Sequence, residues 1–405
     1  MTKIEIILFN MIVDCDEKCL STTIKTIEVI MQASCTFTGT PENYITSRRP
    51  DLPILFFNPV VLQKRVGFFK AGFPGLVTYA VKANDTDEVI ENLSMAGLHT
   101  FDVASPVEIA RVRQICPDAN LHYNNPVRSA YEIQMGIQAG VASWSVDCMS
   151  ELEKLIHQGA MGEIAVRLHL PVSGSAYNFG EKFGACPDDA VALLHRVAEA
   201  GYRPAMTFHV GTQCTDYLAW SQYISACFDI TQRAGVTLAR LNVGGGFPAH
   251  RDETAPDLTS VFGQISEVAA LAFGANAPKL ICEPGRALVS ECYQLLVRVK
   301  GRKTGNILYL NDGIYGAMAE WRDIGPVKRL DVMLPSGKDI TSKTAVFTVF
   351  GPTCDSLDRL PGSLALPHTI QDGDYILISG MGAYSHVTCT PFNGYGAVLR
   401  VTITP

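Results

Sequence analysis

The chain has 405 residues, of which 47% are hydrophobic and 18% charged, and its formal net charge is −7. This composition provides enough apolar material for a large core and excludes extensive disorder, and the length suits one large domain with a smaller one. A mildly acidic chain without a run of Lys or Arg is a poor partner for nucleic acid or an anionic membrane surface, so we expect neither.

The cysteines and the apolar segments indicate the compartment. Twelve cysteines are scattered singly, without the paired spacing of a zinc site, so we expect small buried side chains and no bound metal. The apolar stretch 4–13 is broken by Glu5 and Asn10 and lacks the basic start and cleavage site of a signal peptide. There is no run of about 18 uncharged apolar residues that would span a membrane. We therefore expect a cytoplasmic protein.

The pattern of residues 58–295 predicts a (β/α)8 barrel. Residues 1–45 show no readable pattern. Residues 46–57 are a candidate extra strand for a later β domain, because the segment Leu55–Asn58 is strand-like. From 58 to 295, strand-like runs alternate with amphipathic stretches, and eight such alternations are what this barrel requires. The predicted strands are Val77–Val81, His99–Val103, Leu121–Tyr123, Ser143–Val146, Ile164–His169, Met206–Val210, Arg240–Val243 and Lys279–Cys282. Predicted helices include Asp87–Met95, Pro106–Gln114, Met149–His157, Asp188–Ala200 and Tyr217–Ala234.

The pattern changes in residues 296–405, where strand-like runs follow one another without long helices between them. The predicted strands are Gln294–Lys300, Ile307–Leu310, Ala345–Phe350, Asp374–Ile378 and Gly396–Thr402. Turn residues separate them, which predicts an all-β domain, either a barrel or a sandwich. The expected fold class is therefore α/β: a (β/α)8 barrel followed by a C-terminal all-β domain.

Catalytic groups of such a barrel gather at the C-terminal ends of its strands. Lys82 follows the first predicted strand, where partial desolvation would make its amine nucleophilic enough for Schiff-base chemistry. His209 and Thr212 follow the sixth strand and offer a ring that can stack on an aromatic group and a hydroxyl for a phosphate. By themselves, a solvated surface lysine and a hydrogen-bonded core histidine explain the same residues.

The last two barrel strands end in further polar or glycine-rich clusters. Gly244, Gly245 and Gly246 let backbone N–H groups converge on an anion, and barrels often bind phosphate after strands seven and eight. Glu283 and Arg286 follow the eighth strand and could form a simple surface ion pair. Alternatively, the arginine lies near a phosphate and the carboxylate favours the protonated form of a ring nitrogen, which makes the ring an electron sink.

The whole set of motifs resembles the fold-type III pyridoxal phosphate decarboxylases, the ornithine/lysine/diaminopimelate decarboxylase family with an alanine racemase-like fold. The motifs run in a consistent order from about residue 50 to 400: YAVKAN, FDVAS, VRL, KFGA, FHVGTQ, GGGFP, CEPGR, NDGIYG, GPTCDSLD, GDY and MGAY. The resemblance implies pyridoxal 5'-phosphate as cofactor, with Lys82 as its covalent lysine, His209 stacked on its ring and Glu283 at its ring nitrogen. The other implied cofactor contacts are Asp102, Arg167, Thr212, Gly245, Gly246, Arg286 and Tyr384.

The resemblance also implies a homodimer with shared active sites and a small amino acid as substrate. Cys354 and Asp355 would reach the site of the other subunit, where Cys354 returns a proton to the product. Asp355, together with Asp323, would bind the distal ammonium of the substrate. The implied reaction is the decarboxylation of ornithine or lysine to the amine and CO2, as in polyamine biosynthesis.

Three alternatives remain open on the sequence. Arg322 beside Asp323 departs from the ornithine pattern and would favour an acidic or amidated side chain, so diaminopimelate or a modified or carrier-linked amino acid is a possible substrate. Racemases on a related barrel place an arginine at the ring nitrogen, and Glu283 argues against that chemistry. A non-catalytic binding protein similar to antizyme inhibitors would be expected to lose cofactor residues that are retained here.

Overall fold

The chain folds into two compact units. The structure, a computed structural model, describes residues 35–176, 182–340 and 343–405. The barrel unit comprises residues 62–250 and 255–289; the β unit comprises the described residues of the ranges 35–61, 251–254 and 290–405. Most of the segment 1–45, for which the sequence predicted no element, lies outside the described residues; within its described part β1 spans Cys35–Thr38.

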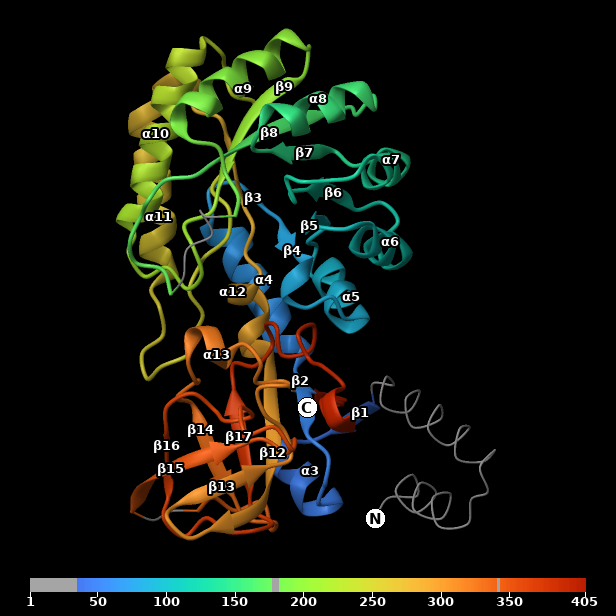
Figure 1. Ribbon diagram of the computed structural model, residues 1–405, viewed down its shortest axis with the longest axis vertical. Helices are drawn as coiled ribbons and strands as arrows, with labels where there is room; N and C mark the ends of the chain where they lie inside the picture. Colours follow the sequence, from blue (N-terminus) through green and yellow to red (C-terminus); the bar gives the residue numbers. More distant parts are fainter. Residues whose placement is uncertain (1–34, 177–181, 341–342) are drawn as a thin grey trace. The chain divides into compact units, whose positions relative to one another are not determined.

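A closed parallel sheet forms the centre of the barrel unit (Figure 1). Its strand segments are β3 (Leu76–Val77), β4 (Tyr79–Ala80), β5 (Thr100–Val103), β6 (Asn120–Tyr123), β7 (Ser143–Val146), β8 (Glu163–Leu168), β9 (Arg203–Phe208), β10 (Arg240–Asn242) and β11 (Lys279–Cys282). β3 and β4 are two halves of one strand, interrupted at Thr78; β3 pairs with β11 and β4 pairs with β5. This double pairing closes the sheet, so the predicted (β/α)8 barrel is confirmed.

A helix follows each barrel strand. They are α5 (Asp87–Met95), α6 (Pro106–Ile115), α7 (Ala130–Gln138), α8 (Met149–His157), α9 (Pro187–Glu199), α10 (Leu218–Ala234), α11 (Leu258–Phe273) and the short α12 (Arg286–Val289), and α4 (Pro59–Gly72) precedes β3. Local sequence sets several ends: Ser129 and Glu132 form a capping box at the start of α7, and Gly235 ends α10 in the left-handed conformation. In Figure 1, α6, α7 and α8 lie outside the strands that precede them.

One helical stretch in the described part of the chain, Leu258–Asn276, is long and apolar enough to cross a membrane by length and composition alone. In the barrel unit its first part is α11, which buries one face. Phe262 packs edge-on against Phe69 of α4, with ring centroids 5.2 Å apart. This packing explains the apolar composition as that of a helix covering a barrel.

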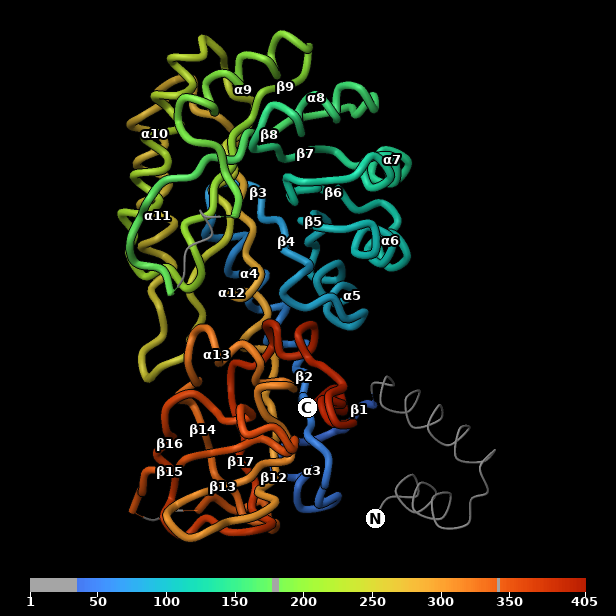
Figure 2. Tube along the Cα trace, viewed as in Figure 1, coloured from blue at the N-terminus to red at the C-terminus, as the bar shows by residue number. Residues whose placement is uncertain are grey.

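The β unit is built from segments that are far apart in the sequence. Its elements are β1, α3 (Pro41–Arg48), β2 (Ile54–Phe57), β12 (Tyr293–Lys303), β13 (Ile307–Leu310), α13 (Trp321–Ile324), β14 (Leu330–Met333), β15 (Thr344–Phe350), β16 (Leu364–Pro367), β17 (Tyr375–Ser379) and β18 (Leu399–Thr404). The segment expected as an extra strand forms β2, which pairs antiparallel with β12 and parallel with β18. Figure 2 shows this early segment, in blue, beside the strand β12 in orange.

The core of the β unit explains why β2 lies there. All four residues of β2 are buried, and Ile54 and Phe56 pack with Leu296, Leu377 and Val401 from three later strands. The backbone N–H and C=O groups of such a buried strand need hydrogen-bond partners on both edges, and β12 and β18 provide them. Strands β14 and β16 were not predicted.

The division between the units differs from the expected boundaries at residues 58, 295 and 296. The barrel unit begins at Leu62 and ends at Val289, before the turn that leads into β12. Residues 251–254 belong to the β unit, because Lys328 donates its backbone N–H to the Arg251 carbonyl at 2.9 Å and its side chain pairs with Asp252 at 2.9 Å.

A buried histidine in β6 gives the barrel a dependence on pH. The His122 side chain is 4% exposed, and its Nδ1 lies 2.6 Å from the hydroxyl of Ser143. Burial, and then the charge of Arg240, lowers the pKa of His122 from 6.5 to about 4. Because the folded pKa is depressed, between pH 6.5 and pH 4 the unfolded chain binds a proton that the folded chain does not.

We therefore expect this residue to reduce the free energy of unfolding by about 1.4 kcal/mol for each pH unit below 6.5, until about pH 4. The measurement is urea unfolding of the wild type and His122→Gln at pH 7 and pH 5. The wild type should lose more stability than the variant over this range. The exposed His157 supplies the control, since His157→Gln should follow the wild type. Parallel losses in wild type and His122→Gln would contradict the prediction.

Candidate active site

Polar side chains converge at the C-terminal ends of the barrel strands. Lys82 follows β4, Asp102 lies in β5, Arg167 in β8, His209 follows β9 and Glu283 follows β11. Their charges act on one another. The charges of Lys82 and Arg167 lower the pKa of Glu283, although the larger effect of burial raises it. The same two charges and burial all lower the pKa of His209. The barrel therefore brings these five predicted residues into one electrostatic cluster.

The exposure of the Lys82 side chain differs from the expectation. The sequence predicted a partly desolvated amine, whereas the structure has an exposed Lys82 side chain. The residue lies in a 3-10 turn, Val81–Ala83, whose other two side chains, those of Val81 and Ala83, are fully buried, so the turn directs the lysine away from the core. Its charge nevertheless lowers the pKa values of Asp102, Glu108, Glu283 and His209.

Glu283 and Asp102 are two buried carboxyl groups that interact. Glu283 is 9% exposed, and burial is the main reason that its pKa is raised. Asp102 is 7% exposed; burial, followed by the charge of Glu283, raises its pKa well above the usual value. The side-chain amides of Asn124 and Asn242 both donate to Oε1 of Glu283, the first at 2.5 Å, and hydrogen bonding to an ionised carboxylate favours the charged form.

His209 is held as a neutral imidazole. Its Nδ1 accepts the backbone N–H of Gly211 at 3.0 Å, which assigns the proton of the neutral ring to Nε2. Burial, followed by the charges of Lys82 and Arg167, lowers the pKa of His209 well below 6.5. A neutral planar ring at this place suits stacking on another ring better than it suits ion pairing.

The triple glycine forms a backbone cradle beside His209. Gly244 and Gly246 have φ of +68° and +87°, which favour glycine. A Cβ on Gly245 would lie 2.9 Å from the Glu283 carbonyl and 3.1 Å from His209 Nε2, so the loop has no room for a side chain. Phe247 anchors the loop by stacking on Trp220, with ring centroids 5.3 Å apart.

Two further predicted residues of the barrel unit carry groups suited to an anion. Thr212 and Arg286 are both buried, the first after β9 and the second at the start of α12. A guanidinium, a hydroxyl and converging backbone N–H groups are the donor set that binds phosphate in proteins.

The remaining predicted residues lie in the β unit. Tyr384 follows β17 and has a φ of +64°, a strained value for a non-glycine residue. Cys354 is exposed, and its backbone N–H donates to the side chain of Asn393 at 3.0 Å. Asp355 accepts the hydroxyl of Tyr315 at 2.5 Å, and this hydrogen bond is the main reason that the pKa of Asp355 is lowered.

The buried Asp358 fixes the turn that carries Cys354 and Asp355. Its carboxylate accepts the backbone N–H of Thr353 at 3.0 Å, the Thr353 hydroxyl at 2.8 Å and the backbone N–H of Ile314 at 3.2 Å. The turn therefore holds its thiol and its carboxylate on a fixed backbone.

Arg322 and Asp323 lie next to each other in α13, and both are exposed. The guanidinium Nε of Arg322 donates to the Ala319 carbonyl at 3.1 Å, which ties the arginine to its own turn. Its charge still reaches Tyr315, whose pKa is raised mainly by the hydrogen bond to Asp355 and lowered by Arg322.

Comparison with known proteins identifies the family. Residues 61–290 match the family model described as pyridoxal-dependent decarboxylase, pyridoxal binding domain. The chain belongs to the pyridoxal-dependent decarboxylases. It is 30% identical to ornithine decarboxylase of Rattus norvegicus over 363 residues, which cover 83% of this chain and 77% of the relative. Antizyme inhibitor 2 of Xenopus laevis is 29% identical over 358 residues, with the same coverage of 83% and 77%.

The solved structures agree with this assignment. The lysine/ornithine decarboxylase of Vibrio vulnificus, solved with cadaverine, has a TM-score of 0.76 and 25% identity and covers 87% of this chain and 94% of its own. Pyridoxal phosphate is therefore the cofactor of this decarboxylase. The residues fit that group: the glycine cradle admits no side chain, His209 is neutral, and Glu283 is a buried carboxylate held by amide donors.

Sequence reasoning did not single out Asn124 and Asn242. Both stand at the carboxyl ends of barrel strands, Asn124 directly after β6 and Asn242 as the last residue of β10. This placement rule, which pointed to Lys82 and Glu283, would also have pointed to the two amides.

Proposed function

We propose that this pyridoxal phosphate-dependent decarboxylase converts a basic amino acid, ornithine or lysine, to the corresponding amine and CO2. The observation that carries the proposal is the buried Glu283, which two amides hold among Lys82, Arg167 and His209. An acid facing the ring nitrogen supports decarboxylation, since it stabilises the protonated ring that withdraws electrons from the substrate.

The barrel residues have separate proposed roles in the site. Pyridoxal phosphate, when bound, supplies an electron sink for the bond to the leaving carboxylate. Lys82 would hold the cofactor covalently and release the amine product, and Glu283 would keep a proton on the ring nitrogen. His209 would pack against the ring and exclude water. Thr212 and Arg286, with the cradle of Gly245 and Gly246, would hold the phosphate.

The β unit supplies the groups proposed to act on the substrate. The protein acts as a homodimer in the cytoplasm, and Cys354 and Asp355 reach the site of the other subunit. Cys354 returns a proton to the Cα atom after CO2 leaves. The lowered pKa of Asp355 and the hydrogen bond from Tyr315 support a fully charged carboxylate there, which suits a distal ammonium.

Replacing Asp323 with alanine should raise KM for the preferred diamino acid by about tenfold, because an ion pair to the distal ammonium is lost. Steady-state kinetics measures this effect, and binding of the cofactor should stay unchanged. Asp372→Ala, an exposed aspartate of the same unit, is the matched control and should have the KM of the wild type. A wild-type KM in Asp323→Ala would remove this residue from the substrate site.

A CO2-release screen tests the substrate class. It compares L- and D-ornithine, lysine, arginine, diaminopimelate and glutamate, and ornithine or lysine should give the highest kcat/KM. A preference for glutamate or diaminopimelate would assign Arg322 a direct role and overturn the basic substrate. The similarity to antizyme inhibitor 2 supports one second candidate, a binding protein without catalysis. Such a protein would release no CO2 and, if it retains no cofactor, would be colourless.

A further inference from the structure

Glu283 is itself held in place by neighbouring amides. The side-chain N–H groups of Asn124 and Asn242 donate to the same oxygen, Oε1. Asn242 is oriented by its own carbonyl oxygen, which accepts the backbone N–H of Gly244 at 2.9 Å, so its nitrogen faces Glu283. Two donors on one oxygen restrict the rotation of the carboxylate.

Asn124 also favours the charged form of Asp102, which the charge of Glu283 opposes. An asparagine amide carries two N–H donors, enough for one bond to each carboxyl group. Asn124 therefore favours the charged forms of two buried acids that repel each other.

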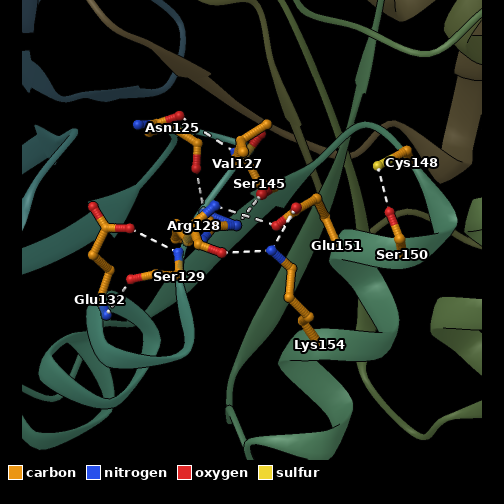
Figure 3. Close-up of polar contacts among 10 residues, drawn as sticks. All are labelled: Asn125, Val127, Arg128, Ser129, Glu132, Ser145, Cys148, Ser150, Glu151 and Lys154. Atoms are coloured by element: carbon orange, nitrogen blue, oxygen red, sulfur yellow. Dashed lines mark hydrogen bonds and ion pairs between the residues drawn. The ribbon is translucent and has the colours of Figure 1, made fainter.

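A buried arginine, Arg128, anchors the loop that follows Asn124, and Figure 3 shows its contacts with Asn125 and Ser145. Arg128 donates to the carbonyls of Tyr123 at 3.2 Å, Asn125 and Ser145, and its side chain is fully buried. Its guanidinium also lies over the ring of Tyr123, 5.0 Å from the centroid. The backbone on both sides of Asn124 is therefore tied to one rigid group.

A second set of contacts holds the loop against α8. The backbone N–H of Arg128 donates to Glu151 at 3.2 Å, and Lys154 donates to the Arg128 carbonyl at 2.5 Å. Glu151 and Lys154 also form an ion pair at 2.6 Å, which Figure 3 shows beside the loop. An amide on so fixed a backbone can orient a carboxylate without losing much side-chain entropy on each turnover.

We propose that Asn124 and Asn242 are positioning residues: they hold Glu283 as the ionised acceptor for the cofactor ring nitrogen. This inference rests on the proposed role of Glu283. Without the two donors, a desolvated Glu283 beside Asp102 would take up a proton and could no longer stabilise a protonated ring. Loss of the ring proton makes the linkage at Lys82 more basic, so that linkage would stay protonated to higher pH.

The test is Asn124→Leu, which keeps the approximate size of the side chain and removes the two N–H groups of the Asn124 amide. A pH titration of the visible absorbance of the substrate-free holoenzyme should move upward by about one unit. The kcat should fall about tenfold or more, with KM changed less than about threefold. Asn124→Asp keeps the shape but adds a third carboxylate to the cluster, so its absorbance shift should be larger than that of Asn124→Leu.

Asn125→Leu is the matched control. Asn125 lies in the same loop. Its side-chain N–H donates to the Ala104 carbonyl at 3.3 Å, and its side-chain oxygen accepts the backbone N–H of Val127 at 3.3 Å. It should have the wild-type titration. Asn242→Leu provides a second, independent variant should Asn124→Leu fail to fold. Folded variants with a wild-type titration and a wild-type kcat would overturn the inference. A wild type without any visible band would instead overturn the proposed cofactor linkage at Lys82, and a wild-type titration in Glu283→Gln would overturn the role proposed for Glu283.

Discussion

Replacing Lys82 with alanine is expected to lower the rate of decarboxylation by about 1,000-fold or more and to remove the visible band of the lysine-bound cofactor. The amine is the group that holds the cofactor and that releases the product, so both functions are lost together. Absorbance spectra of the purified variant and a CO2-release assay measure the two effects.

Lys64 supplies the control for this change, because it is an exposed lysine on α4 at a distance in sequence from the strand ends. Lys64→Ala should keep the wild-type band and the wild-type rate. If Lys82→Ala kept either property of the wild type, the assignment of Lys82 would be wrong, and the cofactor would have to be held by another amine.

Glu283→Gln should lower kcat by about 100-fold, because the neutral amide cannot stabilise a proton on the ring nitrogen. Glutamine has the shape of glutamate, so the packing around the residue is kept. The predicted signature is a large loss in kcat with little change in KM, together with an altered absorbance spectrum, and stopped-flow and steady-state measurements test both.

Glu163 is a matched control for the removal of a buried carboxylate. It is 2% exposed, it begins β8 and so lies at the opposite end of the barrel strands, and it pairs with Arg240 at 3.2 Å. Glu163→Gln is expected to reduce thermal stability while keeping the wild-type absorbance spectrum. An unaltered kcat in Glu283→Gln would contradict the role proposed for the acid.

The barrel could be predicted from sequence because its strands are short apolar runs between amphipathic helices. Two of them, β7 and β11, begin and end at the expected residues. Strands β14 and β16 could not be predicted, because each buries only two of its four residues fully and β16 ends in a proline. Such short segments carry too little periodicity to be distinguished from loops.

The candidate site was predictable where a polar residue directly follows a strand within a motif, as at Lys82 and Glu283. The exposure of Lys82 was predicted wrongly, since it depends on the direction of a three-residue turn that the strand pattern does not determine. Asn124 and Asn242 were missed because they are brought to Glu283 only by closure of the barrel. The spacing of these residues in the sequence does not indicate that they are in contact.

The position of β2 has a consequence for synthesis of the protein on the ribosome. This strand leaves the ribosome early, yet its partners β12 and β18 begin only at Tyr293 and Leu399. The whole barrel unit is translated before β18. The second edge of β2 therefore has no partner strand until translation is almost complete. A premature stop before Leu399 would leave an unpaired hydrophobic edge, which is a template for aggregation and a signal for chaperones.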